Sequence, residues 1–174
     1  MLSPTSVKSN YLKCLQSNFL SFYLSKKALV RISEQFPPFE VRYCPALVAK
    51  KAEVSVNRPI VGTLDSKPRN PFLPFDTNLL VSELNSDFIL IFNKFCVVPE
   101  HLLIITKEFV EQSAEYSGKD FQVVRDVLMG LKDVRPMAFY NSGPEAGASQ
   151  IHRHFQVIPT ESIPIEAHIE SVDK

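Results

Sequence analysis

Residues 139–159 read FYNSGPEAGASQIHRHFQVIP, a loop of small residues that leads directly into a His-x-His-x-Gln pattern. Successive side chains of a strand point to opposite faces, so His152, His154 and Gln156 are expected on one face. The glycine- and serine-rich loop before them offers backbone N–H groups of the kind that bind anions. A lone histidine is most often a structural residue. Two histidines and an amide on one face beside this loop favour a site for a phosphorylated substrate.

His154 is the candidate nucleophile in this pattern. A neutral imidazole carries one N–H group and one bare nitrogen, and a carbonyl that accepts from the N–H would fix the other nitrogen as the attacking atom. Attack on an α-phosphorus would give a covalent nucleotidyl-histidine and divide one displacement into two. Gln156 could donate its amide N–H to a phosphoryl oxygen. Further donors for developing charge are expected at Asn141, Gly147, Ala148 and Ser149.

The two histidines could instead be metal ligands on a strand. A structural or catalytic zinc site needs at least one further protein ligand, and Cys44 and Cys96 are remote and unpaired in the sequence. We therefore expect no metal held by protein ligands alone and no organic cofactor. A divalent cation such as Mg²⁺ would arrive with the phosphates of a substrate.

The remaining pattern predicts an α+β fold, in which a mainly antiparallel sheet carries one principal helix. The helix expected over 119–134 begins near Ser117 or Asp120 and has an apolar stripe of Phe121, Val124, Leu128 and Leu131. Less regular patterns predict helices over 10–27 and 107–116. Strands are expected at 39–48, 78–84, 88–92, 101–106, 137–141 and 154–158. The continuous apolar run in 101–106 should be a central strand covered on both faces.

Composition excludes several classes of protein. The chain has 174 residues, enough for one domain or one domain with a long arm, and its formal net charge is zero. Such a balance argues against a nucleic-acid-binding protein, and no apolar run is long enough to span a membrane. The scattered cysteines fit a reducing compartment, so a cytoplasmic location is expected. Residues 1–33 lack Asp and Glu, which leaves a mitochondrial transit peptide open beside a helix that packs on the domain.

Several blocks of the sequence together carry a family resemblance. They are Asn70-Pro71-Phe72, Asn93-Lys94-Phe95, Val98-Pro99-Glu100-His101, Thr106-Lys107-Glu108-Phe109 with Gln112, and the loop and strand motif of residues 141–156. In this combination the chain resembles the diadenosine tetraphosphate phosphorylases, or ATP adenylyltransferases. These form a branch of the histidine-triad superfamily related to galactose-1-phosphate uridylyltransferase. In this branch glutamine replaces the third histidine of the triad, as Gln156 does here.

The resemblance implies a histidine-triad-like antiparallel sheet with one main helix and assigns roles to single residues. His154 would take the adenylyl group, and His152 would orient it through its backbone. Gln156 and Ser149 would hold the α-phosphate, Asn93 the ribose and Lys50 the polyphosphate. The full set implied to bind nucleotide and phosphate is Lys50, Asn93, Asn141, Ser142, Gly143, Gly147, Ala148, Ser149, His152 and Gln156.

The implied reaction is reversible phosphorolysis of diadenosine tetraphosphate by phosphate to ATP and ADP, through an adenylyl-histidine and with a divalent cation. We expect a monomer whose partners are these small nucleotides. The expected organisation is an N-terminal helix or arm (1–35), a catalytic domain (36–160) and a C-terminal tail (161–174) that is truncated relative to the family. Two alternatives stay open: a related dinucleotide polyphosphate hydrolase or nucleotidyltransferase, since acceptor choice depends on details of the pocket, and an inactive nucleotide-binding protein, which the short tail favours.

Overall fold

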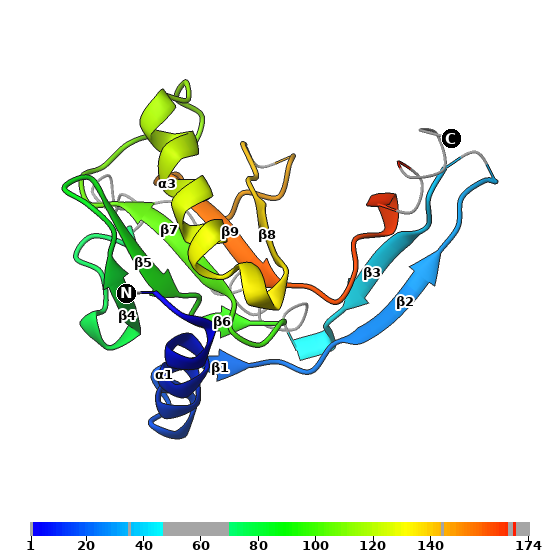
Figure 1. The fold of residues 1–174 in the computed structure, drawn as a ribbon, viewed down its shortest axis with the longest axis horizontal. Helices are drawn as coiled ribbons and strands as arrows, with labels where there is room; N and C mark the ends of the chain where they lie inside the picture. Colours follow the sequence, from blue (N-terminus) through cyan, green and yellow to red (C-terminus); the bar gives the residue numbers. More distant parts are fainter. Residues whose placement is uncertain (1, 35, 47–69, 144, 167–168, 170–174) are drawn as a thin grey trace, which may run out of the picture. The chain divides into compact units, whose positions relative to one another are not determined.

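The computed structural model describes residues 2–34, 36–46, 70–143, 145–166 and 169 (Figure 1). The chain divides into two compact units, Met1–Phe22 with Thr63–Pro159, and Tyr23–Gly62 with Thr160–Lys174. This division differs from the boundary that we expected after residue 35, because the first helix clusters with the central sheet. The two units are described separately below.

The first unit is built on a five-stranded sheet in the order β4-β5-β7-β9-β8, in which each neighbouring pair is antiparallel. Its strands are β4 (Leu80–Glu83), β5 (Phe88–Phe92), β7 (Leu102–Thr106), β8 (Pro136–Phe139) and β9 (His154–Pro159). Every residue of β5 and β7 is buried. The prediction of a central strand over 101–106 is therefore confirmed, since β7 lies between β5 and β9.

The pairing of β7 with β9 determines which side chains share a face. Ile105 lies opposite His154, and Leu103 lies opposite Gln156. Residues directly opposite each other in a sheet point to the same side, so these four side chains lie on one face. Leu102 and Val157 point to the other face, where they lie beside Leu131 at the end of the main helix.

The main helix is α3 (Gly118–Gly130), followed by a 3-10 turn, η2 (Lys132–Val134). Figure 1 shows α3 lying across one face of the sheet. The α+β class with one main helix on an antiparallel sheet is thus confirmed. The predicted apolar stripe is wrong in part, since Phe121 is 63% exposed and the buried positions are Val123, Val127 and Leu131. These three residues repeat every four positions, which keeps them on one side of an α-helix.

The first helix is α1 (Pro4–Gln16), which buries Val7, Tyr11 and Cys14. The Ser3 hydroxyl accepts from the Ser6 N–H at its start, and the chain leaves the helix at Ser17. The predicted helix over 10–27 is therefore wrong in its bounds, although a helix does pack on the core. The following short strand β1 (Ser21–Phe22) pairs in parallel with β6 (Phe95–Cys96).

No helix forms in the described segment 107–116, contrary to our expectation. Its backbone bonds across to the residues before β9 instead. The Gln112 N–H donates to the Ile151 carbonyl at 2.7 Å, and the Arg153 N–H donates to the Val110 carbonyl at 2.8 Å. Together with an antiparallel bridge between Glu111 and His152, these bonds pair the segment 107–116 with the residues just before β9.

The other expected strands shift by a few residues. The predicted strand at 78–84 is a 3-10 turn, η1 (Thr77–Leu79), followed by β4, and that at 137–141 is β8. In the second unit, β2 (Lys26–Val30) and β3 (Phe39–Tyr43) form an antiparallel hairpin. The expected strand 39–48 agrees with β3 in its first half, and residues 47–48 lie outside the described residues.

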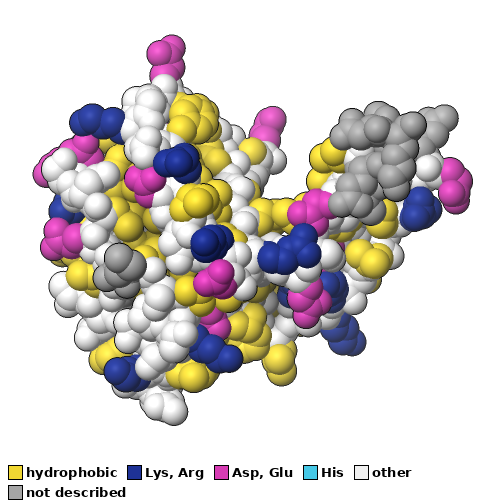
Figure 2. Space-filling model, in the orientation of Figure 1, with side chains coloured by type: hydrophobic (Ala, Val, Ile, Leu, Met, Phe, Trp, Pro, Cys, Tyr) yellow, Lys and Arg dark blue, Asp and Glu magenta, His cyan; other side chains and the backbone are white. Residues whose placement is uncertain are grey.

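Most described charged side chains lie at the surface, while three histidines are buried. Acidic and basic side chains are interspersed on the face drawn in Figure 2, and no described histidine is visible there. His101, His152 and His154 are each at most 6% exposed. The cysteines are free and buried. Within the part of the chain that the structure describes, α1 and α3 fall short of the length and apolarity that a membrane span requires.

Candidate active site

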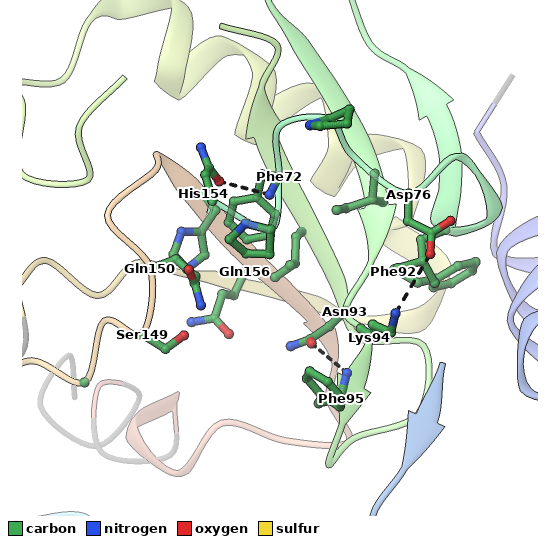
Figure 3. Close-up of a pocket in the computed structure, with 17 residues that line it drawn as sticks. Phe72, Asp76, Phe92, Asn93, Lys94, Phe95, Ser149, Gln150, His154 and Gln156 are labelled. Carbon is green, nitrogen blue, oxygen red and sulfur yellow. Dashed lines mark hydrogen bonds and ion pairs between the residues drawn. The ribbon is translucent and has the colours of Figure 1, made fainter. Parts of the chain in front are cut away.

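A cavity of about 590 Å³ opens on the sheet face that carries His154 and Gln156 (Figure 3). One part of its lining is apolar and includes Phe72, Leu79, Ile91, Phe95 and Leu103. The polar part includes Asn93, Lys94, Ser149, Gln150, His154 and Gln156. This volume suits a small organic ligand, and an apolar surface beside a few converging polar groups is typical of nucleotide-sized sites.

The His154 ring has one nitrogen engaged and one available. Its Nδ1 lies 2.8 Å from the carbonyl oxygen of His152, and a carbonyl can only accept, so Nδ1 carries the proton. Burial lowers the pKa of His154, while the bond to His152 opposes this shift. The ring is therefore neutral near pH 7, with the lone pair on Nε2. No described residue forms a hydrogen bond with Nε2, which leaves a nucleophilic nitrogen in a residue that lines the cavity.

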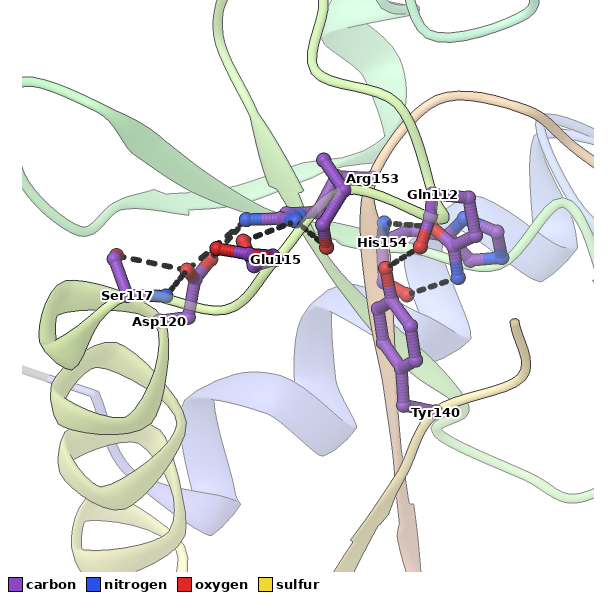
Figure 4. Close-up of polar contacts among 8 residues, drawn as sticks. Gln112, Glu115, Ser117, Asp120, Tyr140, Arg153 and His154 are labelled. Carbon is purple, nitrogen blue, oxygen red and sulfur yellow. Dashed lines mark hydrogen bonds and ion pairs between the residues drawn. The ribbon is translucent and has the colours of Figure 1, made fainter.

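The backbone of His154 is held on both sides by the amide of Gln112 (Figure 4). Gln112 Oε1 accepts from the His154 N–H at 2.8 Å, and Gln112 Nε2 donates to the His154 carbonyl at 3.1 Å. The same Nε2 donates to the Asn141 carbonyl at 2.8 Å, and the Tyr140 hydroxyl donates to the Gln112 carbonyl. One buried side chain thus connects the start of β9 to the end of β8.

The His152 ring is fully buried and is not part of the cavity lining. Its Nε2 donates to the Thr106 carbonyl at 2.9 Å and is 2.8 Å from the Thr106 hydroxyl, and its Nδ1 accepts from Asn70 Nδ2 at 2.9 Å. Burial lowers its pKa, so this ring is also neutral. The structure therefore places the His152 carbonyl against His154 Nδ1 and leaves the His152 ring out of the cavity lining, and its orienting role stays a prediction.

Phe72 places an aromatic ring against both histidines. Its ring centroid lies 5.6 Å from that of His152 and 5.3 Å from that of His154. The Phe72 N–H donates to Asn70 Oδ1 at 2.9 Å, so the Asn70 side chain orients both Phe72 and His152. These contacts place the two histidines on the same side of the β9 segment, as the alternation predicts.

The Gln156 side chain is bonded to a buried histidine. His101 Nε2 lies 3.1 Å from Gln156 Oε1, and His101 Nδ1 lies 3.3 Å from Asn93 Nδ2. The Phe95 N–H in turn donates to Asn93 Oδ1 at 3.0 Å. Burial lowers the pKa of His101 to about 4, so His101 is neutral at physiological pH.

Arg153 points away from the cavity and forms a buried ion pair with Asp120 of α3 (Figure 4). Arg153 Nη1 lies 3.0 Å from Asp120 Oδ2, and both side chains are at most 5% exposed. Arg153 Nη2 also donates to the carbonyls of Ala114 and Glu115. The Ser117 N–H and hydroxyl donate to the same Asp120 oxygen. This network joins the start of α3 to the residue beside His154.

The loop before β9 contributes to the cavity at some positions only. Gly143 and Gly147 have φ values of +79° and +83°, a region that favours glycine, and the Ala148 N–H donates to the Gly143 carbonyl at 3.0 Å. These features close the loop into a turn. Among the residues we predicted for binding, those lining the cavity are Asn93, Gly147, Ser149 and Gln156.

The other predicted binding residues that the structure describes are absent from the cavity lining. The Asn141 carbonyl bonds to Gln112, and its amide lies 3.9 Å from the place where a Cβ on Gly147 would sit. Ser142 is exposed, Gly143 and Ala148 are half-buried, and Lys50 lies outside the described residues.

Sequence reasoning missed the residues that orient the site from elsewhere in the chain. Asn70, His101 and Gln112 appeared only as parts of family blocks, and no role followed from their local pattern. Their partners are 28 to 82 positions away in the sequence,, so the contacts exist only after folding. The exceptions in spacing are Phe72, two residues from Asn70, and Asn93, eight residues from His101.

The described lining offers few ligands for a metal ion. Within the described residues no three His, Cys, Asp or Glu side chains group closely enough to hold one. Asp76 is the carboxylate in the described lining, and its Oδ2 lies 4.0 Å from Lys94 Nζ. Such a lining fits a cation that is carried mainly by substrate phosphates and water.

Comparison with known proteins yields a family and several relatives. The family model for the Ap4A phosphorylase N-terminal domain matches residues 6–171. The chain is 38% identical over 139 residues to diadenosine 5',5'''-P1,P4-tetraphosphate phosphorylase 2 of Saccharomyces cerevisiae, covering 72% of this chain and 41% of the relative. It is also 38% identical over 78 residues to Protein APA1 of the same organism, covering 42% of this chain and 24% of the relative.

The solved structures of a yeast Ap4A phosphorylase have a fold similar to that of this chain. The crystal structure of yeast Ap4A phosphorylase Apa2 in complex with AMP is similar with a TM-score of 0.75 and 25% identity, over 95% of this chain and 52% of that one. The Ap4A complex of Apa2 has a similar fold, with a TM-score of 0.77 and 23% identity over 98% of this chain and 56% of that chain. The chain therefore spans about half or less of the length of these relatives.

Proposed function

Because this chain belongs to the Ap4A phosphorylase N-terminal domain family, we propose that it is a nucleotidyltransferase that cleaves diadenosine tetraphosphate with phosphate. The observation that carries the proposal is the bond from His154 Nδ1 to the His152 carbonyl, which leaves Nε2 bare in a cavity-lining residue. The relatives named above support the choice of substrate, since their names and complexes refer to Ap4A and AMP.

In the first step the His154 Nε2 lone pair attacks the α-phosphorus of diadenosine tetraphosphate. The new N–P bond forms as the bond to the bridging oxygen breaks, and ATP leaves. The Nδ1 proton stays on the ring, where the His152 carbonyl stabilises the positive charge that develops. Gln156 and Ser149 line the cavity beside His154, and their donors would stabilise charge on the phosphoryl oxygens.

In the second step an oxygen of inorganic phosphate attacks the same phosphorus. The N–P bond breaks, ADP leaves, and His154 returns to its neutral form. The adenine would lie on the apolar lining that includes Phe72 and Phe95, and the ribose near Asn93. Lys94 in the same lining supplies positive charge for the polyphosphate. A divalent cation such as Mg²⁺ would neutralise further phosphate charge.

The proposed location is cytoplasmic, and the acid-free N-terminal segment is proposed to be part of the folded domain. The acid-free segment contributes Val7, Tyr11 and Cys14 of α1 to the core, so removal of these residues as a transit peptide would expose buried apolar surface. The monomeric state stays a prediction from the sequence.

The test uses diadenosine tetraphosphate labelled in its α-phosphates, with wild type and His154→Ala. Wild type should gain the mass of one adenylyl group and release ATP, and ADP should appear only when phosphate is added. His154→Ala should lose both signals, by about 10⁴-fold or more, because the nucleophile is absent. Gln122→Ala, on the exposed side of α3, is the control and should react as wild type does.

Two other outcomes would point to the alternatives. Release of AMP without added phosphate would indicate that water accepts the adenylyl group, and the protein would then be a hydrolase. Nucleotide binding by a folded wild-type chain that forms neither adduct nor product would contradict the proposal and support a binding protein.

A further inference from the structure

A chain of three hydrogen bonds reaches Gln156 from the backbone of Phe95. The Phe95 N–H can only donate, so the Asn93 atom that faces it at 3.0 Å is the oxygen Oδ1. The other end of the Asn93 amide, Nδ2, must then face His101 Nδ1 at 3.3 Å. Because Nδ2 can only donate, His101 Nδ1 is the acceptor of this pair.

The state of Nδ1 determines the state of the whole imidazole. A neutral imidazole that accepts at Nδ1 carries its proton on Nε2. His101 is 6% exposed, and burial lowers its pKa to about 4, so a second proton is disfavoured at neutral pH. His101 Nε2 therefore donates, and the Gln156 atom 3.1 Å away is the acceptor Oε1.

With Oε1 bonded to His101, the NH₂ end of the Gln156 amide is left for the cavity that Gln156 lines. A glutamine amide has nearly the same shape after a rotation of about 180°, which exchanges donor and acceptor. The rotated form would present an oxygen to the phosphoryl oxygens and repel them. Shape alone does not select the useful orientation, so a directional partner is needed.

We propose that His101 is a positioning residue that holds Gln156 with its NH₂ group toward the cavity, through a tautomer fixed by Asn93. The consequence for catalysis rests on the function proposed above, in which Gln156 donates to the α-phosphate. The orientation itself rests only on the contacts of Phe95, Asn93 and His101 with their partners.

Two substitutions at His101 separate positioning from packing. His101→Phe retains an aromatic ring but removes both hydrogen bonds. In His101→Gln the side-chain amide nitrogen can occupy nearly the place of the imidazole Nε2 and donate to Gln156 Oε1. Val98→Ala is the control for lost packing, because Val98 is 7% exposed in the same segment and makes no bond in this chain of contacts.

The kinetic measurement is the single-turnover rate of adenylyl-histidine formation, with the dissociation constant for the nucleotide measured separately. His101→Phe should lower the rate by about 10²–10³-fold, the usual effect of one lost donor, while nucleotide affinity changes by less than about threefold. His101→Gln should recover most of the rate, and Val98→Ala should react as wild type does. A wild-type rate in His101→Phe, or no recovery in a folded His101→Gln, would overturn the proposal.

The second measurement is independent of activity. Nitrogen NMR of the full chain, with His101 assigned by comparison with His101→Phe, reports which ring nitrogen is protonated. We expect a protonated Nε2 and a bare Nδ1 at pH 7. The opposite tautomer, or a doubly protonated ring, would overturn the inferred orientation of Gln156. If wild type forms no adduct, the proposed function fails, and the tautomer still decides the proposal on His101.

Discussion

Neutral histidines at this site have a consequence for acid stability. Burial lowers the pKa of His101 to about 4 from its ordinary value near 6.5, so between these values the unfolded chain binds more protons than the folded one. Stability is then complete above about pH 6.5 and falls as the pH approaches 4. His152 and His154 shift in the same direction, chiefly through burial.

The expected loss from His101 alone is about 2 kcal/mol between pH 7 and pH 5, at 1.36 kcal/mol for each pH unit below 6.5. Urea unfolding of wild type and His101→Phe at the two pH values measures it. The free energy of unfolding of the variant should depend less on pH by about this amount. Equal pH dependence of the two proteins would show that His101 titrates alike in the folded and unfolded chain.

At the scale of the elements, one ion pair connects α3 to the catalytic strand. Asp120→Asn leaves the guanidinium of Arg153 buried without a counter-charge, and it should lower the free energy of unfolding by about 3–5 kcal/mol. Asp126→Asn is the matched control, because Asp126 is an exposed carboxylate on the same helix and its loss should cost less than about 1 kcal/mol. Urea unfolding of both variants at pH 7 compares them.

The double variant Asp120→Leu with Arg153→Met tests the same explanation. It removes both charges and keeps apolar volume, so it should recover much of the stability that Asp120→Asn loses. If the double variant is less stable than Asp120→Asn, the bonds of Arg153 to Ala114 and Glu115 matter more than the charge pair.

The sequence predicted elements best where one local signal dominates. The apolar runs of β5 and β7 are buried at every position; both segments are predicted as strands, and the run in 101–106 also predicts a central one. Segment 107–116 has helical spacing but bonds to residues 151–153, a tertiary contact that local periodicity does not contain. The sequence pattern predicts the first helix too late, because the start of α1 depends on Ser3 and Pro4, which the charge pattern of residues 1–33 does not mark.

For the whole molecule, α1 should be part of the cooperative fold. Tyr11 is 5% exposed, and its ring centroid lies 5.9 Å from that of Phe92 in β5. Tyr11→Ala should therefore lower the free energy of unfolding by about 3 kcal/mol. Leu12→Ala, at the next position and 46% exposed, should change it by less than about 1 kcal/mol. Similar urea midpoints for the two variants would mean that α1 unfolds separately.

The candidate site could be predicted to the extent that it is contiguous in sequence. His154, Gln156, Ser149 and Gly147 come from one stretch and line one cavity, since strand alternation and loop composition are local properties. The orientation of these groups depends on Asn70, His101 and Gln112, whose partners are brought close by the pairing of β7 and β9 and by the segment before β9. No local pattern contains that information.

The pairing of Ile105 with His154 and of Leu103 with Gln156 also limits how the gene for this protein can change in length. One codon inserted within β9 would turn every residue beyond it over to the opposite face of the sheet, so that an insertion before Gln156 would move Gln156 to the α3 side. Two inserted codons would return these side chains to their original face, but each would lie two residues further along the strand. In the loop of residues 142–150 an insertion leaves both histidines on their side. Length variation should therefore be tolerated in the loop, and within β9 its effect should depend on whether the number of added residues is odd or even.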